Sequence, residues 1–260
     1  MPQENIKKRF LVFGDLHTKY NIFLKAINKF ETEKFDKIIF LGDYCDDWNA
    51  SPEASRELLE HLIEFKNKYH NQCILLLGNH DLSEWFGGDF KCSGYNSITH
   101  LICKDLFDKN ENLFQIAYPH KNWLFTHAGV HNSWLKDIYL LDEQFKEMKY
   151  SYRISAELNL SLSERNNDIK YNRLFKALNS VGGYRGGFSS PSPIWTDYKE
   201  LISNPAPHIN QVVGHTPVKT IVSHTIKREN KKDILYFCDT HSTYTNGENI
   251  GDNSFLELEI

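Results

Sequence analysis

The chain has 260 residues, of which 40% are hydrophobic and 25% charged, and its formal net charge is −4 at pH 7. These values are ordinary for a soluble globular protein of one large or two small domains, and the acidic balance argues against a protein that tracks along long nucleic acid. No apolar run approaches a membrane span, and the N-terminal residues lack the apolar stretch of a signal peptide. We therefore expect a cytoplasmic protein without membrane partners.

Short apolar runs alternate with amphipathic stretches in the first hundred residues. The runs occupy residues 10–13, 38–41 and 73–77, and helical patterns fill the intervals between them. Ser51 as N-cap and Pro52 at the first helical position predict where the second helix begins. Continuous apolar strands separated by helices are typical of βαβ units with a parallel sheet that is buried on both faces.

The later apolar runs lie closer together and predict antiparallel or mixed pairing. They cover residues 113–117, 123–125, 211–213, 220–226, 234–237 and 255–260. We expect a single domain over residues 1–260, with a largely helical insertion at about 132–190. Within the insertion, Ser161 with Glu164 predicts a capping box, and Asn167 or Asp168 is the expected cap of a last helix.

The five cysteines, Cys45, Cys73, Cys92, Cys103 and Cys238, are scattered and show no C-x-x-C spacing. This pattern is neither a disulfide framework nor a structural zinc site. We expect reduced and mostly buried thiols.

Five of the predicted strands run directly into side chains that are able to bind a metal ion. The segments that follow them are Gly14-Asp15-Leu16-His17, Gly42-Asp43, Gly78-Asn79-His80-Asp81, Thr126-His127 and Gly214-His215. One such end is usually a simple turn, but five in one chain are not explained in this way. Ligands collect at the carboxyl ends of strands in α/β sheets because the loops there share one crevice.

These residue types predict two metal ions. The two ligand sets, which share Asp43 as a bridge, are Asp15, His17 and Asp43, and Asp43, Asn79, His127 and His215. A mixed set of oxygen and nitrogen ligands without thiolate suits Mn²⁺, Fe or Zn²⁺, of which Mn²⁺ is our first expectation. Two ions about 3.5–4 Å apart generate a bridging hydroxide and clamp the oxygens of an in-line displacement at phosphorus.

In this order, the five motifs resemble those of the calcineurin-like metallophosphoesterases. The chain is most similar to the phosphoprotein-phosphatase branch, including its small bacterial and phage members and the symmetrical diadenosine tetraphosphatases. The resemblance implies an α/β fold, an αββα sandwich of two mixed sheets flanked by helices, and hydrolysis of a phosphate ester by a dimetal-bridging hydroxide.

The resemblance also implies roles for residues beside the metal ligands. His80 would donate a proton to the leaving-group oxygen, with Asp46 orienting it, because a histidinium held by a carboxylate is a good acid near neutral pH. Asp239 would support the metal ligands from behind, although His241 replaces the glycine of the family's Asp-Thr-Gly. Asn79 and His80 would also contact the substrate phosphate.

The chain departs from the family pattern at three positions. Thr216-Pro217 follows His215, where many phosphodiesterases and nucleases carry Gly-His-x-His, and this difference favours the phosphatase branch. Asp47-Trp48 replaces an Arg-Gly pair whose arginine grips phosphate, which removes a cation and adds negative charge. Asp81 replaces a common glutamate. Arg185, in a glycine-rich loop, is our candidate for the lost phosphate-binding arginine.

The favoured function is hydrolysis of phosphate monoesters, in a phosphoprotein or a small phosphorylated molecule. The alternative is a nucleotide pyrophosphohydrolase of the diadenosine tetraphosphatase type, and a nuclease or a non-catalytic scaffold fits less well. Trp48, Trp85 and Phe86 lie near motif residues, where ordinary packing is the favoured interpretation and stacking on an aromatic or nucleotide substrate the alternative.

Overall fold

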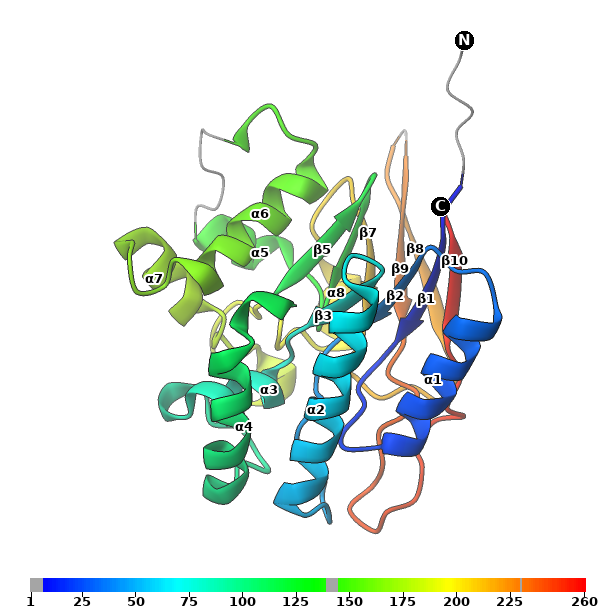
Figure 1. Ribbon diagram of the computed structural model, residues 1–260. Helices are drawn as coiled ribbons and strands as arrows, with labels where there is room; N and C mark the ends of the chain where they lie inside the picture. The colour runs from blue at the N-terminus through cyan, green and yellow to red at the C-terminus, as the bar shows by residue number, and fades with distance from the viewer. Residues whose placement is uncertain (1–6, 139–144, 230) are drawn as a thin grey trace.

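Two five-stranded mixed sheets pack face to face in the computed structural model, which describes residues 7–138, 145–229 and 231–260 (Figure 1). The first sheet, in spatial order, is β10 (Leu256–Glu259), β1 (Arg9–Phe13), β2 (Lys37–Phe40), β3 (Cys73–Leu76) and β4 (Phe114–Gln115). The second is β5 (Ala117–His120), β6 (Trp123–Thr126), β7 (Asn210–Val213), β9 (Lys232–Phe237) and β8 (Val222–Lys227). The inner strands of both sheets are parallel, and β10, β5 and β8 are antiparallel edges.

An apolar layer between the sheets holds them together. Phe10, Val12 and Leu41 from the first sheet meet Phe125 and Val212 from the second, and all five are fully buried. Burying a side chain of this size stabilises a fold by about 1.5–3 kcal/mol. The layer explains why the strand sequences are apolar throughout, since helices or the other sheet cover both faces of each sheet.

The chain crosses from one sheet to the other within a single residue. The apolar run at 113–117, expected as one strand, divides into β4 and β5 around the buried Ile116. The Asn159 side chain accepts the N–H groups of Ile116 at 2.9 Å and Ala117 at 3.0 Å. This residue therefore satisfies the backbone where neither ladder does, an arrangement that periodicity alone does not reveal.

Helices cover the outer faces of the sandwich. On the first sheet pack α1 (Tyr20–Thr32) and α2 (Pro52–Tyr69), followed at its edge by α3 (Asn79–Phe86), η1 (Gly88–Phe90), α4 (Ser97–Lys109) and η2 (Glu111–Leu113). In the chain, the segment that connects β6 to β7 contains α5 (Asn132–Asp137), α6 (Tyr150–Ser163), α7 (Ile169–Ala177), η4 (Gly183–Arg185) and α8 (Tyr198–Ser203). Leu201 of α8 packs on Val213 and Phe237 of the second sheet. The predicted αββα sandwich is confirmed.

Two of the three predicted helix caps are present. Ser51 accepts the N–H of Ala54 at 3.3 Å, and Asp168 accepts the N–H of Lys170 at 2.7 Å. The capping box at Ser161 and Glu164 is wrong, because Ser161 lies inside α6 and its hydroxyl donates to the Leu158 carbonyl at 2.6 Å. Buried Leu158 and Leu162 carry the apolar face of α6 past this local signal.

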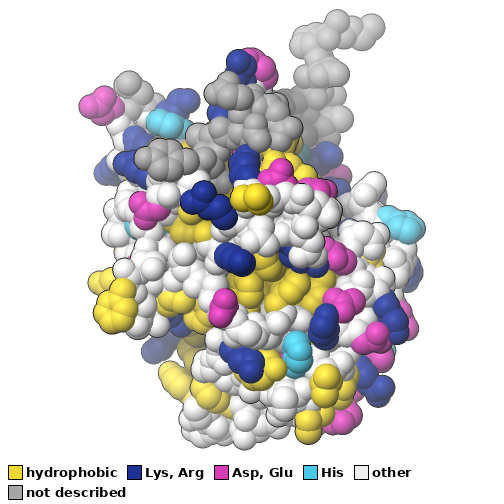
Figure 2. All heavy atoms as spheres, turned by 90° about the vertical axis from the view of Figure 1, so that its left-hand side faces the viewer, with side chains coloured by type: hydrophobic (Ala, Val, Ile, Leu, Met, Phe, Trp, Pro, Cys, Tyr) yellow, Lys and Arg dark blue, Asp and Glu magenta, His cyan; other side chains and the backbone are white. Residues whose placement is uncertain are grey.

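The surface is mixed in charge. On the face shown in Figure 2, basic and acidic side chains are interspersed among small apolar patches. In the described residues, no helix combines the length and apolar character needed to cross a membrane. All five cysteines are free thiols, and only Cys92 is not fully buried.

Candidate active site

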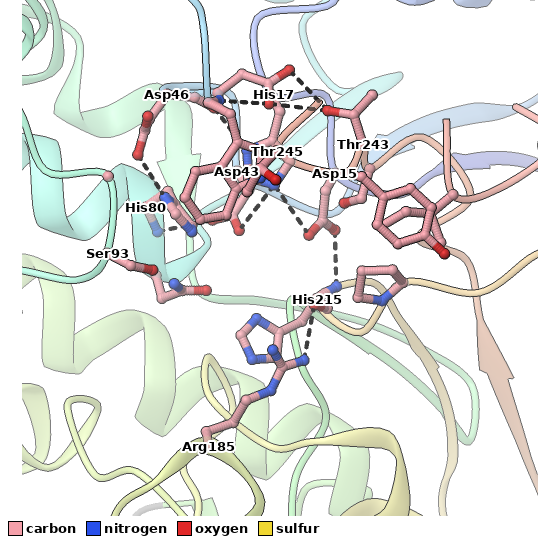
Figure 3. A pocket seen from close by; sticks show the side chains of 18 of the residues that line it. Asp15, His17, Asp43, Asp46, His80, Ser93, Arg185, His215, Thr243 and Thr245 are labelled. Carbon is pink, nitrogen blue, oxygen red and sulfur yellow. Dashed lines mark hydrogen bonds and ion pairs between the residues drawn. The ribbon is translucent and has the colours of Figure 1, made fainter. Parts of the chain in front are cut away.

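The carboxyl ends of strands from both sheets meet at one pocket. β1, β2 and β3 deliver Asp15, Asp43 and Asn79 from the first sheet, and β6 and β7 deliver His127 and His215 from the second. The cavity has a volume of about 370 Å³ (Figure 3). This is the size of a small-molecule site. The structure therefore brings together all five strand ends that the sequence singled out.

Asp43 lies between two groups of potential ligands. Its Oδ2 is 3.9 Å from His17 Nε2 and 3.3 Å from His127 Nε2. Two clusters, whose ligand atoms lie within 4.8 Å of one another, share it: His17, Asp43 and His80, and Asp43, His127 and His215. This is the position that a carboxylate bridging two ions requires.

Potential ligand atoms crowd around His127 Nε2. The His127 Nδ1–H donates to the Leu41 carbonyl at 2.9 Å, so Nε2 is the ring nitrogen that faces the other candidate ligands. Asn79 Oδ1 and His215 Nδ1 each lie 3.1 Å from that atom. Two ligands of one ion, each bound at about 2.0–2.2 Å, are at most about 4.4 Å apart, and these distances fall below that limit. A shared cation would take the place of the proton that a charged His127 carries at Nε2.

The first ligand set is similarly arranged. The Asp15 carboxylate places Oδ2 3.8 Å from His17 Nε2, and its Oδ1 accepts the backbone N–H of His215 at 2.9 Å. The His17 Nδ1–H donates to the Asp46 carbonyl at 2.8 Å, which leaves Nε2 directed at the two carboxylates. His80 also approaches this set, but its Nδ1 is occupied by Asp46.

The charges of the site call for a cation. Asp15, Asp43 and Asp239 are all buried, and burial together with the charge of Asp239 raises the pKa of Asp15 well above its usual range. Burial disfavours a charged His127, but Asp43 and Asp15 outweigh it and raise its pKa to about 9. Buried acids held this close are costly unless protons or metal ions compensate them. The donor set, oxygen and imidazole nitrogen without thiolate, fits two divalent ions.

Backbone strain is concentrated at these ligands. His17, Asp43, Asp46 and His215 all have positive φ, between 41° and 68°. Such angles are uncommon for residues other than glycine and persist where the surroundings enforce them. A Cβ on Gly78 would lie 2.0 Å from Asp43 Oδ1, so glycine is required there by close approach of the two loops.

The carboxylate of Asp81 organises the loop that carries Asp43, a role that the sequence did not reveal. It accepts the backbone N–H groups of Gly78 at 2.9 Å, Asp43 at 2.7 Å and Tyr44 at 2.8 Å. The shorter Asp81 thus acts through backbone contacts at the start of α3. In the sequence, the replacement of the family's glutamate by Asp81 was the one feature that could have drawn attention to this role.

His80 and Asp46 form a pair at the edge of the metal-ligand set. Asp46 Oδ2 lies 3.0 Å from His80 Nδ1, and Figure 3 shows both side chains on the same side of the pocket. Burial lowers the pKa of His80, but the charge of Asp43 and the hydrogen bond to Asp46 raise it well above its usual value. A raised pKa favours the protonated imidazole, which is the form that a general acid needs.

The model of the calcineurin-like phosphoesterase family matches residues 8–242. The chain belongs to this family. Membership implies a hydrolase that acts on phosphate esters.

Solved structures show the same fold at low identity. A cold-active protein-tyrosine phosphatase of a psychrophilic Shewanella species is 18% identical, at TM-score 0.52, over 96% of this chain and 77% of that one. A point mutant of a cold-active protein-tyrosine phosphatase is 17% identical, at TM-score 0.53 and the same coverage. A protein serine/threonine phosphatase from Saccharomyces cerevisiae is 16% identical, at TM-score 0.47, over 99% of this chain and 81% of that one. The likeness to the two protein-tyrosine phosphatases is, at these identities, one of fold.

Arg185 reaches the pocket from η4, on the side of His215. Its Nη2 donates to the His215 carbonyl at 3.2 Å and to Thr216 Oγ1 at 3.0 Å, and its Nε lies 3.2 Å from Asp197 Oδ2. Figure 3 shows the side chain extending toward His215. The guanidinium is held in place at the pocket wall.

The sequence led us to expect that Asp47 adds negative charge to the pocket. In the structure this charge is balanced by a neighbouring cation. Lys19 Nζ donates to Asp47 Oδ2 at 2.8 Å, and the Thr243 hydroxyl donates to Oδ1 at 3.2 Å. Burial raises the pKa of Asp47, but Lys19 outweighs it and leaves the pKa lowered. The residue that replaces the phosphate-gripping arginine thus ties two loops together.

The remaining candidate residues are either buried in the core or exposed at the pocket. Trp85 is fully buried against Phe107, and Phe86 packs on Phe90, so both are packing residues as expected. Trp48 is 57% exposed and lines the pocket, so it is not a core residue. Asp239 is buried and accepts the hydroxyl of Ser242 at 2.8 Å.

Proposed function

We propose that the protein hydrolyses phosphate monoesters with two divalent metal ions, of which Mn²⁺ is the first candidate. The observation that carries the proposal is the position of Asp43, within 3.9 Å of His17 on one side and 3.3 Å of His127 on the other. Asp15 and His17 would complete one site, and Asn79, His127 and His215 the other. When bound, two divalent ions would activate water for attack and neutralise the phosphate oxygens.

The protein's own residues then orient and protonate the substrate. His80, held by Asp46 at 3.0 Å, is placed to give its proton to the departing oxygen. Asn79 and Arg185 supply neutral and cationic contacts to the phosphate. Arg185 comes from the segment between β6 and β7, which we propose is an insertion within one catalytic domain.

The other functions have less support. A nucleotide pyrophosphohydrolase would be favoured by several lysine or arginine side chains in the pocket, whereas the lining has Arg185 of this kind, together with the acidic Asp46 and Asp47. Thr216-Pro217 in place of a further histidine argues against a nuclease. A scaffold without catalysis would have no need of the ligand set and His80, which this chain retains.

A substrate panel tests the proposal. The purified protein, with Mn²⁺, Fe²⁺ or Zn²⁺ added in turn, is given an aryl phosphate, an aryl phosphodiester, a phosphopeptide and a dinucleoside polyphosphate. We expect turnover of the monoesters, abolished by chelator. Preferential cleavage of the dinucleoside polyphosphate or the diester would replace the proposal with the corresponding alternative.

A further inference from the structure

Two exposed aromatic side chains stand at the mouth of the pocket without an evident packing role. Trp48 is 57% exposed and Tyr244 is 53% exposed, and both line the same cavity as Asp43 and His80. Large aromatic side chains usually bury most of their surface. Exposure of two beside a reacting centre marks a surface that is open to a ligand.

The two rings are brought to one edge of the pocket by contacts between their chain neighbours. Asp47 accepts the Thr243 hydroxyl at 3.2 Å, and the Asn49 side chain donates to the Thr245 carbonyl at 3.4 Å. Trp48 lies between Asp47 and Asn49 in the chain, and Tyr244 between Thr243 and Thr245. The two loops are therefore joined on both sides of the two aromatic residues, which places both residues on one joined part of the pocket rim.

The loop that carries Tyr244 has internal order. Ile250 N–H donates to the Ser242 carbonyl at 2.9 Å, and Tyr244 N–H donates to the Glu248 carbonyl at 2.8 Å. Figure 3 shows Thr243 and Thr245 across the pocket from Arg185. The two aromatic residues thus belong to the wall opposite the cation.

We propose that Trp48 and Tyr244 form a subsite for a planar aromatic leaving group, so that the preferred substrates are aryl phosphate monoesters such as a phosphotyrosyl side chain. This inference rests on the proposed function and names its substrate class. His80 lines the same cavity as the two rings, so a ring on the leaving-group side of a bound phosphate would face them, and aromatic faces stack favourably. Trp195, Pro217 and Ile250 add apolar lining.

The charges favour a monoester over a nucleotide polyphosphate. Lys19 is paired with Asp47, so its ammonium is not free to bind a second phosphate. Arg185 and the metal ions suffice for one phosphoryl group. An aromatic ring attached directly to a single phosphate therefore fits the pocket better than a base separated from the scissile bond by a phosphate chain.

The test compares aryl with alkyl phosphates in Trp48→Ala and Tyr244→Ala proteins. We expect KM for an aryl phosphate to rise about 3–10-fold in each variant, the scale of one aromatic contact, with KM for an alkyl phosphate nearly unchanged. Tyr244→Phe keeps the ring and should retain most of the preference. Phe188→Ala, at a fully exposed aromatic position outside this pocket, is the matched control.

Competitive inhibition separates binding from chemistry. Phenylphosphonate should bind more tightly than methylphosphonate to the wild type, and the ratio of their inhibition constants should fall about 3–10-fold in Trp48→Ala. An unchanged ratio with monoesterase activity intact would overturn the subsite alone. A wild type without monoesterase activity would overturn the proposed function. A loss confined to a dinucleoside polyphosphate would assign the rings to a nucleobase and overturn the aryl monoester.

Discussion

The carboxylate of Asp46 lies 3.0 Å from the Nδ1 of His80, and the backbone carbonyl of the same aspartate accepts the Nδ1–H of His17 at 2.8 Å. One residue thus orients both the proposed proton donor and a proposed metal ligand. Its backbone has a positive φ of 68°, an uncommon conformation for aspartate that persists where surrounding contacts enforce it.

Replacing His80 should separate proton donation from metal binding. His80→Asn should keep both ions and lower kcat by roughly 10²–10⁴, the usual contribution of a positioned acid. The loss should shrink as the leaving group becomes more acidic, because such a group needs little protonation. Measuring kcat for a series of aryl phosphates of differing leaving-group pKa checks this. An equal loss across the series would remove His80 from the role of acid.

Replacing Asp43 should weaken both metal sites together. Asp43→Asn removes the charge that faces His17 and His127, so we expect loss of both ions and of activity. Elemental analysis and titration with Mn²⁺ measure the stoichiometry. The control is Asp105→Asn, an exposed acid on α4 that pairs with Lys109. A variant that retains two tightly bound ions would show that Asp43 does not bridge.

Replacing Arg185 tests the phosphate contact. Arg185→Ala should raise KM and lower kcat/KM roughly 10–100-fold, the scale of one charge-assisted contact. Arg185→Lys should retain only part of the wild-type kcat/KM, since an ammonium does not bind two phosphate oxygens at once. Metal content is measured in parallel, because Arg185 also contacts the His215 carbonyl. Unchanged KM and kcat for a monoester would leave the arginine a purely structural role.

Glu84 should make stability fall as the pH rises. Its side chain is buried, Oε1 accepts the Asn96 N–H at 3.0 Å, and burial raises its pKa from 4.5 to about 7. Folding therefore favours the protonated acid, and this stabilisation, present below about pH 4.5, is lost as the pH rises through 7. Between pH 5 and 8, Glu84→Gln should gain about 2 kcal/mol relative to wild type. Urea unfolding of the chelator-treated proteins at both pH values measures the difference in free energy of unfolding between Glu84→Gln and wild type. If this difference were the same at both pH values, the prediction would be wrong.

The sequence by itself determined which residues are the candidate metal ligands. Each ligand follows directly on an apolar strand, and parallel strands direct their carboxyl ends to one edge, so local pattern was enough to gather Asp15, Asn79 and His215. Helix starts at Ser51 and Asp168 were equally local, since a cap contacts the next few residues. The false cap at Ser161 shows the limit, because apolar packing of a long helix overrides a four-residue signal.

Only the tertiary structure decided what surrounds those ligands. The switch between sheets at Ile116, the grip of Asp81 on the Asp43 loop and the pairing of Asp47 with Thr243 depend on which backbones come close in space. Asp47 and Thr243 are 196 positions apart, and neither residue type announces a partner at that range. Short polar contacts between loops become possible only after the apolar layer has brought the sheets together, and so sequence periodicity, which reports burial, does not record them.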